Sequence, residues 1–225
     1  MTKDDVCRRI KEVGILPGIR VPSAGDALFA ASEMFRCDIP VVELTMTVPG
    51  ALGVLKELAR MAPQVIVGAG TVLDTKTAAA CIDAGAVFIS SPGLDPTVVE
   101  FTVKNNICSI PGALTPSEIM EALRSGADMI KIFPCAQVGG PDYIRALRAP
   151  FPDVSFIAAG GVNQQTAADF IRRGASALGI RHELIPPEAV SLRDHNWIQE
   201  LAGRFLTIVN RTRAELAELQ AAPVA

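Results

Sequence analysis

Short apolar segments recur along the chain, and a stretch with helical spacing separates each from the next. A strand buried on both faces typically reads as a continuous apolar run of about four to eight residues, rich in β-branched side chains. On this pattern we predict eight strands, at residues 15–20, 41–46, 65–70, 87–92, 108–112, 129–134, 155–161 and 177–182.

The segments between these strands carry signals that start helices. Ser23, Thr115 and Asn163 each precede a stretch with helical spacing, and Thr115 is followed three residues later by a glutamate, as in a capping box. Strands that alternate with helices in this way indicate parallel βαβ units. We therefore predict an α/β fold, a TIM-type (β/α)8 barrel, with an open doubly wound sheet as the alternative.

The length of 225 residues and the apolar content of 49% suit one domain of barrel size. We expect a barrel core at about residues 13–190 and an extra N-terminal helix at about residues 3–12. A C-terminal helical extension should cover about residues 195–218. The last six residues, QAAPVA, are expected to be frayed.

Charge and cysteine content narrow the range of partners. A net charge of −3 without any lysine- or arginine-rich run argues against nucleic acid and anionic membranes. The N-terminus, MTKDDVCRRIKEVG, has no apolar stretch of signal-peptide or membrane-spanning length. The five cysteines are scattered without a Cys-x-x-Cys pair, which favours neither a disulfide framework nor a zinc site. We expect a cytoplasmic protein that acts on small molecules.

The sequence signals neither a metal nor a cofactor. The two histidines, His182 and His195, lack the spacing of a zinc-binding motif, and we expect His195 to lie at the surface or to cap a helix. The glycines of VGAGT, at 67–71, lack the spacing of a nucleotide-binding loop. Glycine at a strand end instead allows a ligand to approach the backbone closely.

One lysine interrupts an otherwise apolar strand, MIKIFP at 129–134. Lysine is rarely buried, and in a dry interior it needs a charged partner or loses proton affinity. Alternate side chains of a strand share a face, so Met129, Lys131 and Phe133 point one way while the isoleucines point the other. With the isoleucines against the helices, Lys131 faces the barrel interior and Phe133 packs the inner wall.

The same alternation turns two further charged side chains toward Lys131. The second strand points Glu43 inward together with Thr45 and Thr47. Arg20 falls at the carboxyl end of the first strand, which is the end where barrel active sites are built. The pattern therefore predicts that an arginine, a glutamate and a lysine from three strands converge at one mouth.

Two interpretations of this cluster stay open. In the first, it is a buried ionic network that only fixes the fold. In the second, the lysine is a desolvated nucleophile that forms a Schiff base with a carbonyl compound, and the carboxylate moves protons. A lysine pKa lowered from about 10.4 to about 7–8 costs roughly 4 kcal/mol, and shifts of that size cluster at functional sites.

A series of motifs gives the chain a family resemblance. In chain order they are VVELTMTVPGA, VGAGTVLD, ISSPGLD, IPGALTPSE, MIKIFPCAQVGGP, APFPDVSFIAAGGV and LGIRHEL. As a set, across about residues 13–190, they resemble the 2-keto-3-deoxy-6-phosphogluconate (KDPG) and 4-hydroxy-2-oxoglutarate aldolase family. The resemblance implies a TIM barrel, usually trimeric, that cleaves a 2-keto-4-hydroxy acid without a metal, through an imine with pyruvate.

The resemblance also implies roles for individual residues. Lys131 corresponds to the imine lysine, Glu43 to the general acid and base, and Thr71 to the hydroxyl that orients the pyruvyl group. Some members hold the pyruvate carboxylate with an arginine at the position of Thr47, and others with one at the end of the first strand. We interpret Arg20 as that clamp, with a salt bridge at the rim as the alternative. The turns at Pro92 and Pro111 would position the substrate.

The sequence departs from the family pattern where the distal phosphate is held. Gly160 and Gly161 are retained, but Ala159 replaces the usual threonine, and Arg181-His182 replaces a Gly-Ser pair. Arg181 either adds a cation for the phosphate, fills its space, or turns outward to solvent. The residues after Phe133-Pro134 also lack the acidic side chain common in relatives.

Three hypotheses for the function follow. The first is a class I aldolase, a lyase of the Entner-Doudoroff pathway of carbohydrate metabolism, which cleaves KDPG to pyruvate and glyceraldehyde 3-phosphate. The second keeps this chemistry but acts on 4-hydroxy-2-oxoglutarate or another unphosphorylated 2-keto-4-hydroxy acid. The third is a non-catalytic trimeric barrel that binds a keto acid. Under the first two hypotheses we expect a homotrimer with no cofactor.

Overall fold

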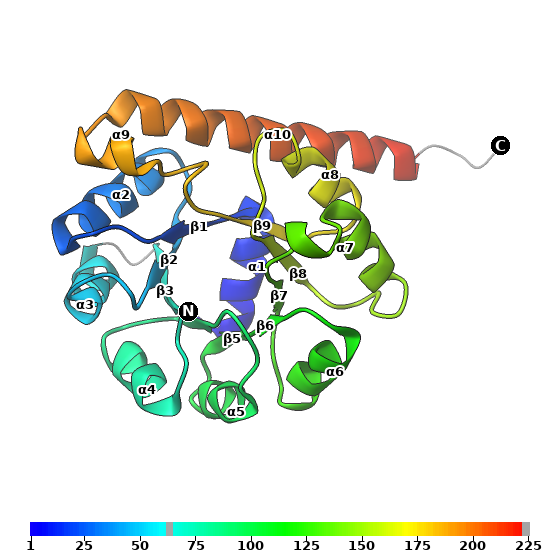
Figure 1. The fold of residues 1–225 in the computed structure, drawn as a ribbon, viewed down its shortest axis with the longest axis horizontal. Coiled ribbons are helices and arrows are strands. Elements are labelled where there is room, and N and C mark those ends of the chain that lie inside the picture. The colour runs from blue at the N-terminus through cyan, green and yellow to red at the C-terminus, as the bar shows by residue number, and fades with distance from the viewer. Residues whose placement is uncertain (62–64, 222–225) are drawn as a thin grey trace.

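The strands form one parallel sheet that curves into a barrel in the computed structural model, which describes residues 1–61 and 65–221 (Figure 1). The strand order is β5-β4-β3-β2-β1-β9-β8-β7-β6. The strands are β1 (Ile15–Ile19), β2 (Val41–Thr45), β3 (Ile66–Gly70), β4 (Phe88–Ser90), β5 (Cys108–Ile110), β6 (Gly112–Ala113), β7 (Ile130–Ile132), β8 (Phe156–Ala159) and β9 (Ala177–Ile180).

The two ends of this strand order are joined by Pro111, which lies between β5 and β6. Proline has no backbone N–H for a ladder hydrogen bond, which explains why the fifth predicted strand is divided in two. Counted as one, β5 and β6 complete a ring of eight strands. The prediction of a TIM-type barrel is confirmed, and the doubly wound alternative is wrong.

All eight predicted strands are present, and most are shorter than predicted at one or both ends. Prolines account for two of the early ends, because Pro92 and Pro134 follow β4 and β7 and cannot continue a ladder. Strand β2 ends at Thr45, so Thr47 is exposed beyond it. The expectation that Thr47 faces the interior is therefore wrong.

Helices surround the barrel on its outside (Figure 1). The buried alanine, valine, leucine and isoleucine side chains between strands and helices form the core. The helices that follow β1 to β8 are α2 (Ala24–Arg36), α3 (Ala51–Met61), α4 (Thr75–Asp83), α5 (Pro96–Lys104), α6 (Pro116–Arg124), η1 (Ala136–Val138, a 3-10 turn), α7 (Pro141–Arg148) and α8 (Ala167–Arg172).

Two of the three predicted helix starts are confirmed. The Ser23 hydroxyl accepts a hydrogen bond from a backbone N–H of α2, and Thr115 forms a capping box with Glu118 at the start of α6. Asn163 instead accepts bonds from the N–H groups of Gln165 and Thr166, in a turn that precedes α8. That helix therefore begins later than predicted.

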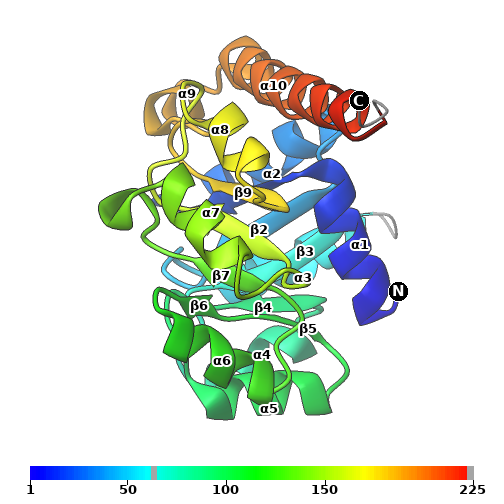
Figure 2. The ribbon, with the colours of Figure 1, turned by 90° about the vertical axis from the view of Figure 1, so that its right-hand side faces the viewer.

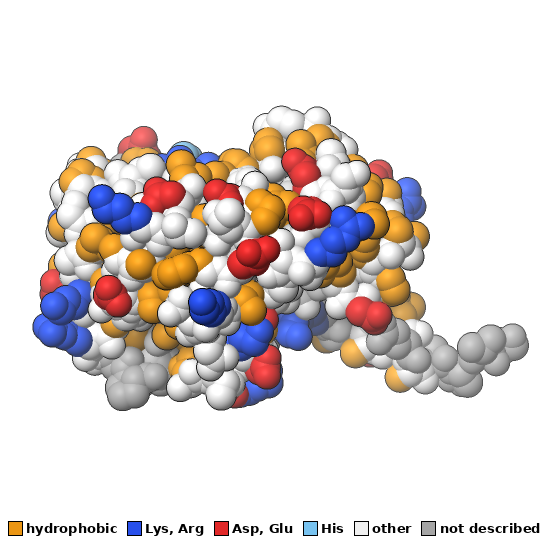
Figure 3. All heavy atoms as spheres, turned by 90° about the horizontal axis from the view of Figure 1, so that it is seen from below, with side chains coloured by type: hydrophobic (Ala, Val, Ile, Leu, Met, Phe, Trp, Pro, Cys, Tyr) orange, Lys and Arg blue, Asp and Glu red, His pale blue; other side chains and the backbone are white. Residues whose placement is uncertain are grey.

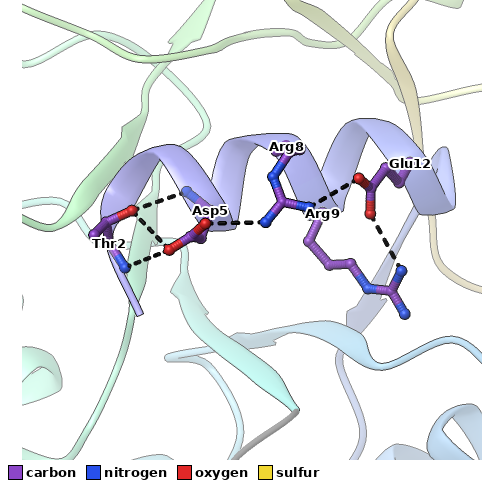
Figure 4. Close-up of polar contacts among 5 residues, drawn as sticks. All are labelled: Thr2, Asp5, Arg8, Arg9 and Glu12. Carbon is purple, nitrogen blue, oxygen red and sulfur yellow. Dashed lines mark hydrogen bonds and ion pairs between the residues drawn. The ribbon is translucent and has the colours of Figure 1, made fainter.

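Helix α1 (Lys3–Val13) crosses the end of the barrel at which the strands begin (Figure 2). Its first turn is fixed by a capping box between Thr2 and Asp5, and Arg8 bridges Asp5 to Glu12 along its exposed side (Figure 4). The opposite side is apolar and buried against the barrel. The predicted N-terminal helix thus closes the floor of the barrel and leaves the other end for a site.

Two helices follow β9, namely α9 (Pro187–Ser191) and the long α10 (His195–Ala221), which runs along the top of Figure 1. Helix α10 packs on α2, α8 and α9. The fully buried carboxylate of Glu33, on α2, accepts hydrogen bonds from Gln199 and Arg36 and contacts His195 Nδ1 at 3.0 Å. Gln220 and Ala221 belong to α10, and the rest of the QAAPVA segment lies outside the described residues.

Charged side chains of both signs lie scattered among apolar ones on the face seen in Figure 3. They do not gather there into a basic region of the kind that binds nucleic acid. Over residues 1–61 and 65–221, no helix has the length and apolar content needed to cross a membrane. The same residues contain no group of three or more His, Cys, Asp and Glu side chains arranged to hold a metal ion.

Candidate active site

Lys131 and Glu43 meet inside the barrel, although their strands lie opposite each other. Strand β7 is four steps from β2 in both directions around the ring when β5 and β6 count as one. The Lys131 Nζ lies 3.1 Å from Glu43 Oε1 and 3.0 Å from Oε2. The two side chains are only 13% and 6% exposed. The buried lysine therefore has the charged partner that its surroundings require.

A glycine on the neighbouring strand β3 makes room for the Glu43 side chain. Glu43 pairs in register with Gly18 of β1 and Gly68 of β3. A Cβ on Gly70, two residues further along β3, would lie 2.4 Å from Glu43 Oε1. Only a residue without a side chain leaves the carboxylate free to reach across the barrel toward Lys131.

Ser90 is a third polar group at this contact, and the sequence reasoning did not assign it. Its side chain is fully buried on β4, and its Oγ lies 3.4 Å from Lys131 Nζ. The strand alternation that identified Glu43 could have found Ser90, because Ser90 is the inward polar residue of the ISSP motif. The hydroxyl provides a second site for proton exchange beside the amine.

Arg20 and Thr71 lie together at the mouth, above the Lys131–Glu43 pair. The Arg20 Nη2 donates to the Thr71 hydroxyl at 3.2 Å. Thr71 has a φ of 60°, which a β-branched residue rarely adopts. Such backbone strain costs about 1–3 kcal/mol and clusters at functional sites. In the described part of the chain no carboxylate pairs with Arg20, so the rim salt bridge is not formed.

These side chains line a cavity of about 50 Å³ at the C-terminal end of the barrel. Pro92 and Gly160 are on its wall. Pro111 is not among its lining residues, and its carbonyl oxygen instead accepts the backbone N–H of Lys131 at 2.9 Å. The wall is formed by Leu16, Gly18, Arg20, Glu43, Thr45, Thr71, Pro92, Lys131, Phe133, Ala159, Gly160, Gly179, Ile180 and Arg181.

A second, outer cavity of about 180 Å³ lies over the loops that follow β8 and β9. A Cβ on Gly161, whose φ is 87°, would lie 2.2 Å from the Cβ of Ala136, so this turn requires glycine. The inner and outer cavities share part of their walls. The outer one is lined by Gly160, Gly161, Val162, Asn163, Gly179, Arg181, His182 and Glu183.

Arg181 lines both cavities and is partly buried. Burial lowers the pKa of its guanidinium, and the charge of Arg20 lowers this pKa further, while the charge of Glu43 opposes the change. Its place in the walls of both cavities shows that the side chain points toward the mouth of the barrel. The alternative in which Arg181 turns outward to solvent is wrong.

A family model described as KDPG and KHG aldolase matches residues 6–201. The chain belongs to this aldolase family. Among relatives, it is 35% identical to the 2-dehydro-3-deoxy-phosphogluconate aldolase of Pseudomonas aeruginosa over 75% of each chain. It is 30% identical to the KHG/KDPG aldolase of Escherichia coli, over 84% of this chain and 88% of that one.

Solved structures of the aldolase family share the fold. The KDPG aldolase of Legionella pneumophila, in which pyruvate was captured as a covalent carbinolamine intermediate, superposes with a TM-score of 0.81 at 31% identity. That match covers 86% of this chain and 94% of the Legionella chain. The KDPG aldolase of Zymomonas mobilis with 3-phosphoglycerate matches with a TM-score of 0.81 at 25% identity, over 92% and 97% of the two chains.

In this aldolase the inner cavity brings together most of the residues that the sequence singled out. Gly161 lies in the wall of the outer cavity, and Pro111 lies behind the backbone of Lys131. The residues gathered around the inner cavity are Arg20, Glu43, Thr71, Pro92, Lys131, Gly160 and Arg181.

Proposed function

We propose that this chain is a class I aldolase that cleaves KDPG to pyruvate and glyceraldehyde 3-phosphate. The observation that carries the proposal is the contact of 3.0–3.1 Å between Lys131 Nζ and the Glu43 carboxylate in the inner cavity of the barrel. Membership of a family in which one relative was captured with pyruvate as a carbinolamine supports the same chemistry.

The reaction begins with transfer of an ammonium proton from Lys131 to Glu43, which leaves a free amine. The amine attacks the C2 carbonyl carbon of the substrate and forms a carbinolamine. Glu43 returns the proton to the departing hydroxyl, water leaves, and a protonated imine forms. Arg20 and Thr71 hold the C1 carboxylate and fix the pyruvyl group over the amine.

Cleavage then uses the protonated imine as an electron sink. Glu43, directly or through a water molecule, takes the proton of the C4 hydroxyl, the C3–C4 bond breaks, and the aldehyde leaves. The bonding electrons move to the imine nitrogen and give an enamine. The enamine takes a proton at C3, water hydrolyses the imine, and pyruvate leaves with Lys131 restored. Ser90 is placed to exchange protons with the amine during these steps.

The remainder of the substrate would extend from the inner cavity into the outer one. The turn at Gly160 and Gly161 presents open backbone there, and loops after the last two strands hold phosphate groups in many barrels. The hydroxyl that family members place at position 159 is absent, because this residue is alanine. We therefore assign the phosphate mainly to the backbone groups of this turn.

Incubation with pyruvate and sodium borohydride tests the proposal. Reduction of the imine should add a stable covalent mass to the peptide that contains Lys131, and Lys131→Met should abolish both this adduct and pyruvate release from KDPG. A wild-type protein that forms no adduct would refute the imine mechanism. An adduct without cleavage of any 2-keto-4-hydroxy acid would instead favour the non-catalytic keto-acid-binding barrel.

We also propose a homotrimer with a cytoplasmic location. Exposed apolar side chains on the outer helices, such as Met120 and Leu123 of α6, suit contact with a second copy. Light scattering should then give three times the 23.8 kDa of one chain. A mass equal to one chain at micromolar concentration would contradict the trimer.

A further inference from the structure

Arg181 lies across the mouth of the barrel at the height of Glu43. In the sheet register Pro17 of β1 pairs with Ile180 of β9, so Arg181 follows at the level of Gly18, which itself pairs with Glu43. The position that a Cβ on Gly18 would occupy lies 2.8 Å from the Arg181 Cγ and 3.3 Å from its Cδ. The stem of the arginine therefore occupies the space that the missing side chain leaves.

The Arg181 guanidinium has no anionic partner in the described part of the chain. Its side chain forms none of the hydrogen bonds or ion pairs found among these residues. Every fully buried side-chain nitrogen there has a hydrogen-bond partner, so the unpaired nitrogens of Arg181 are not fully buried. Its nitrogens consequently reach the cavities that it lines. The Arg20 guanidinium stands close enough to lower the pKa of Arg181 by its charge. The Glu43 carboxylate also acts on Arg181, but it is paired with Lys131. The charges of the two guanidinium groups are therefore left to attract an anion.

The outer cavity is electrostatically less suited to an anion than the inner mouth. Its wall carries the carboxylate of Glu183 and the imidazole of His182, and its only guanidinium is that of Arg181, shared with the inner cavity. A phosphate seated far out would approach the Glu183 carboxylate, and like charges repel. The favourable position for an anion is therefore close to Arg181, on the inner side.

The proposed reaction fixes where each substrate carbon must lie, so this inference rests on the proposed function. With C2 bound to Lys131 and the C4 hydroxyl at Glu43, a carboxylate on C4 is one bond from the reacting carbon. The phosphorus of KDPG is four bonds from the same carbon. We propose that Arg181 is a specificity-determining residue that binds a carboxylate on C4 and thereby raises the activity on short dicarboxylic 2-keto-4-hydroxy acids relative to the activity on KDPG, which remains a substrate.

Two variants separate the charge of Arg181 from its volume. We would measure kcat/KM by pyruvate release for 4-hydroxy-2-oxoglutarate and for KDPG, with the wild type, Arg181→Met and Arg181→Gly. Both variants should lower the ratio of the short acid to KDPG by about 100-fold, because both remove a charge-assisted contact. Arg181→Gly should in addition raise kcat/KM for KDPG, since it opens the path to the outer cavity.

Arg173→Met is a matched control, because it removes an arginine from the outside of the barrel, where Arg173 pairs with Asp142. It should leave the ratio of the two substrates unchanged. A ratio that stays within threefold of the wild type in both Arg181 variants would overturn the inference. The borohydride trap on the wild type separates failure of the proposed function from failure of the inference about Arg181. Without an adduct the proposed function fails, whereas an adduct with an unchanged substrate ratio refutes only the role of Arg181.

Discussion

Gly70 faces Glu43 so closely that the Glu43 carboxylate occupies the space that a side chain at residue 70 would need. A Cβ on Gly70 would lie 2.4 Å from Oε1 and 2.6 Å from Cδ of Glu43. Real Cβ atoms do not approach other heavy atoms to this distance, so any substituent at residue 70 must displace the carboxylate. The proposed general base is thus held in position by the absence of a side chain on the neighbouring strand.

Gly70→Ala should therefore reduce kcat by about 100-fold or more, the contribution expected of a positioned general acid and base. The backbone of Gly70 has no positive φ, so its backbone conformation is open to alanine, and the only clash is with the Glu43 side chain. The check is steady-state kinetics together with a circular dichroism spectrum that shows the fold is kept. Wild-type kcat in a folded Gly70→Ala protein would show that the position of Glu43 does not matter for turnover.

Glu43→Gln should separate the carboxylate from the lysine that it contacts. The amide keeps the size of the side chain but cannot accept the C4 hydroxyl proton, so kcat should fall by about 10²–10⁴-fold. Pyruvate in excess should still give a borohydride adduct on Lys131, formed more slowly than in the wild type. Full activity of this variant would transfer the proton-moving role to another group, with Ser90 as the nearest candidate.

The stability of the long C-terminal helix depends on one buried carboxylate. Glu33→Ala removes the acceptor for Arg36 and Gln199 and the contact with His195, and should lower the free energy of unfolding by about 1.5–3 kcal/mol, the range for a hydrogen bond to a charged group. Urea denaturation measures this change. Glu200→Ala, which removes an exposed pair with Arg204, should change the midpoint far less, and equal effects would contradict the assignment.

Two glycines inside exposed helix segments offer a gain in stability. Gly53 of α3 and Gly203 of α10 have nothing within 4 Å of an added Cβ. Gly53→Ala and Gly203→Ala should each raise the free energy of unfolding by about 0.5–1 kcal/mol, since alanine loses less backbone entropy in a helix. Thermal and urea unfolding of the single and double variants measure this gain, which should be additive because the helices are separate. A lower melting temperature in either variant would contradict open space at that position.

The alternation of side chains along single strands predicted the site better than the motifs predicted its details. Side chains alternate along a strand with a period of two residues, which places Lys131 and Glu43 inside the barrel without any knowledge of which strands are neighbours. The contact between them then follows from closure of the barrel. The same rule applied to Ser90 would have completed the cluster. It failed at Thr47 because β2 ends at Thr45, and strand ends depend on hydrogen bonds that sequence patterns do not specify.

Other features of the site depend on contacts between distant segments. The direction of Arg181 is set by the empty space at Gly18, on a strand more than 160 residues earlier in the chain. The left-handed backbone of Thr71 opposes the local preference of threonine, so only the surrounding structure determines it. Pro111 looked like a substrate contact, yet it divides the fifth strand and receives the backbone N–H of Lys131.

The cysteines should differ in reactivity because their pKa values move in opposite directions. The Cys7 Sγ lies 3.3 Å from the Cys108 Sγ, and the hydrogen bond between the two thiols lowers the pKa of Cys7 while it raises that of Cys108. Burial raises the pKa of Cys81 to about 11 and that of Cys135 to about 12, and it also raises the pKa of Cys37.

Because the thiolate is the reactive form, a lower pKa gives faster alkylation at a fixed pH below it. Iodoacetamide at pH 8 should thus label Cys7 before the other four cysteines, as peptide mapping of a time course would show. Cys108→Ala removes the hydrogen-bond partner that can donate to the Cys7 thiolate, so the pH at which Cys7 is half-maximally reactive should rise. Labelling that begins at Cys37, or a Cys7 profile unchanged by Cys108→Ala, would show that the sulfur contact does not control the thiol.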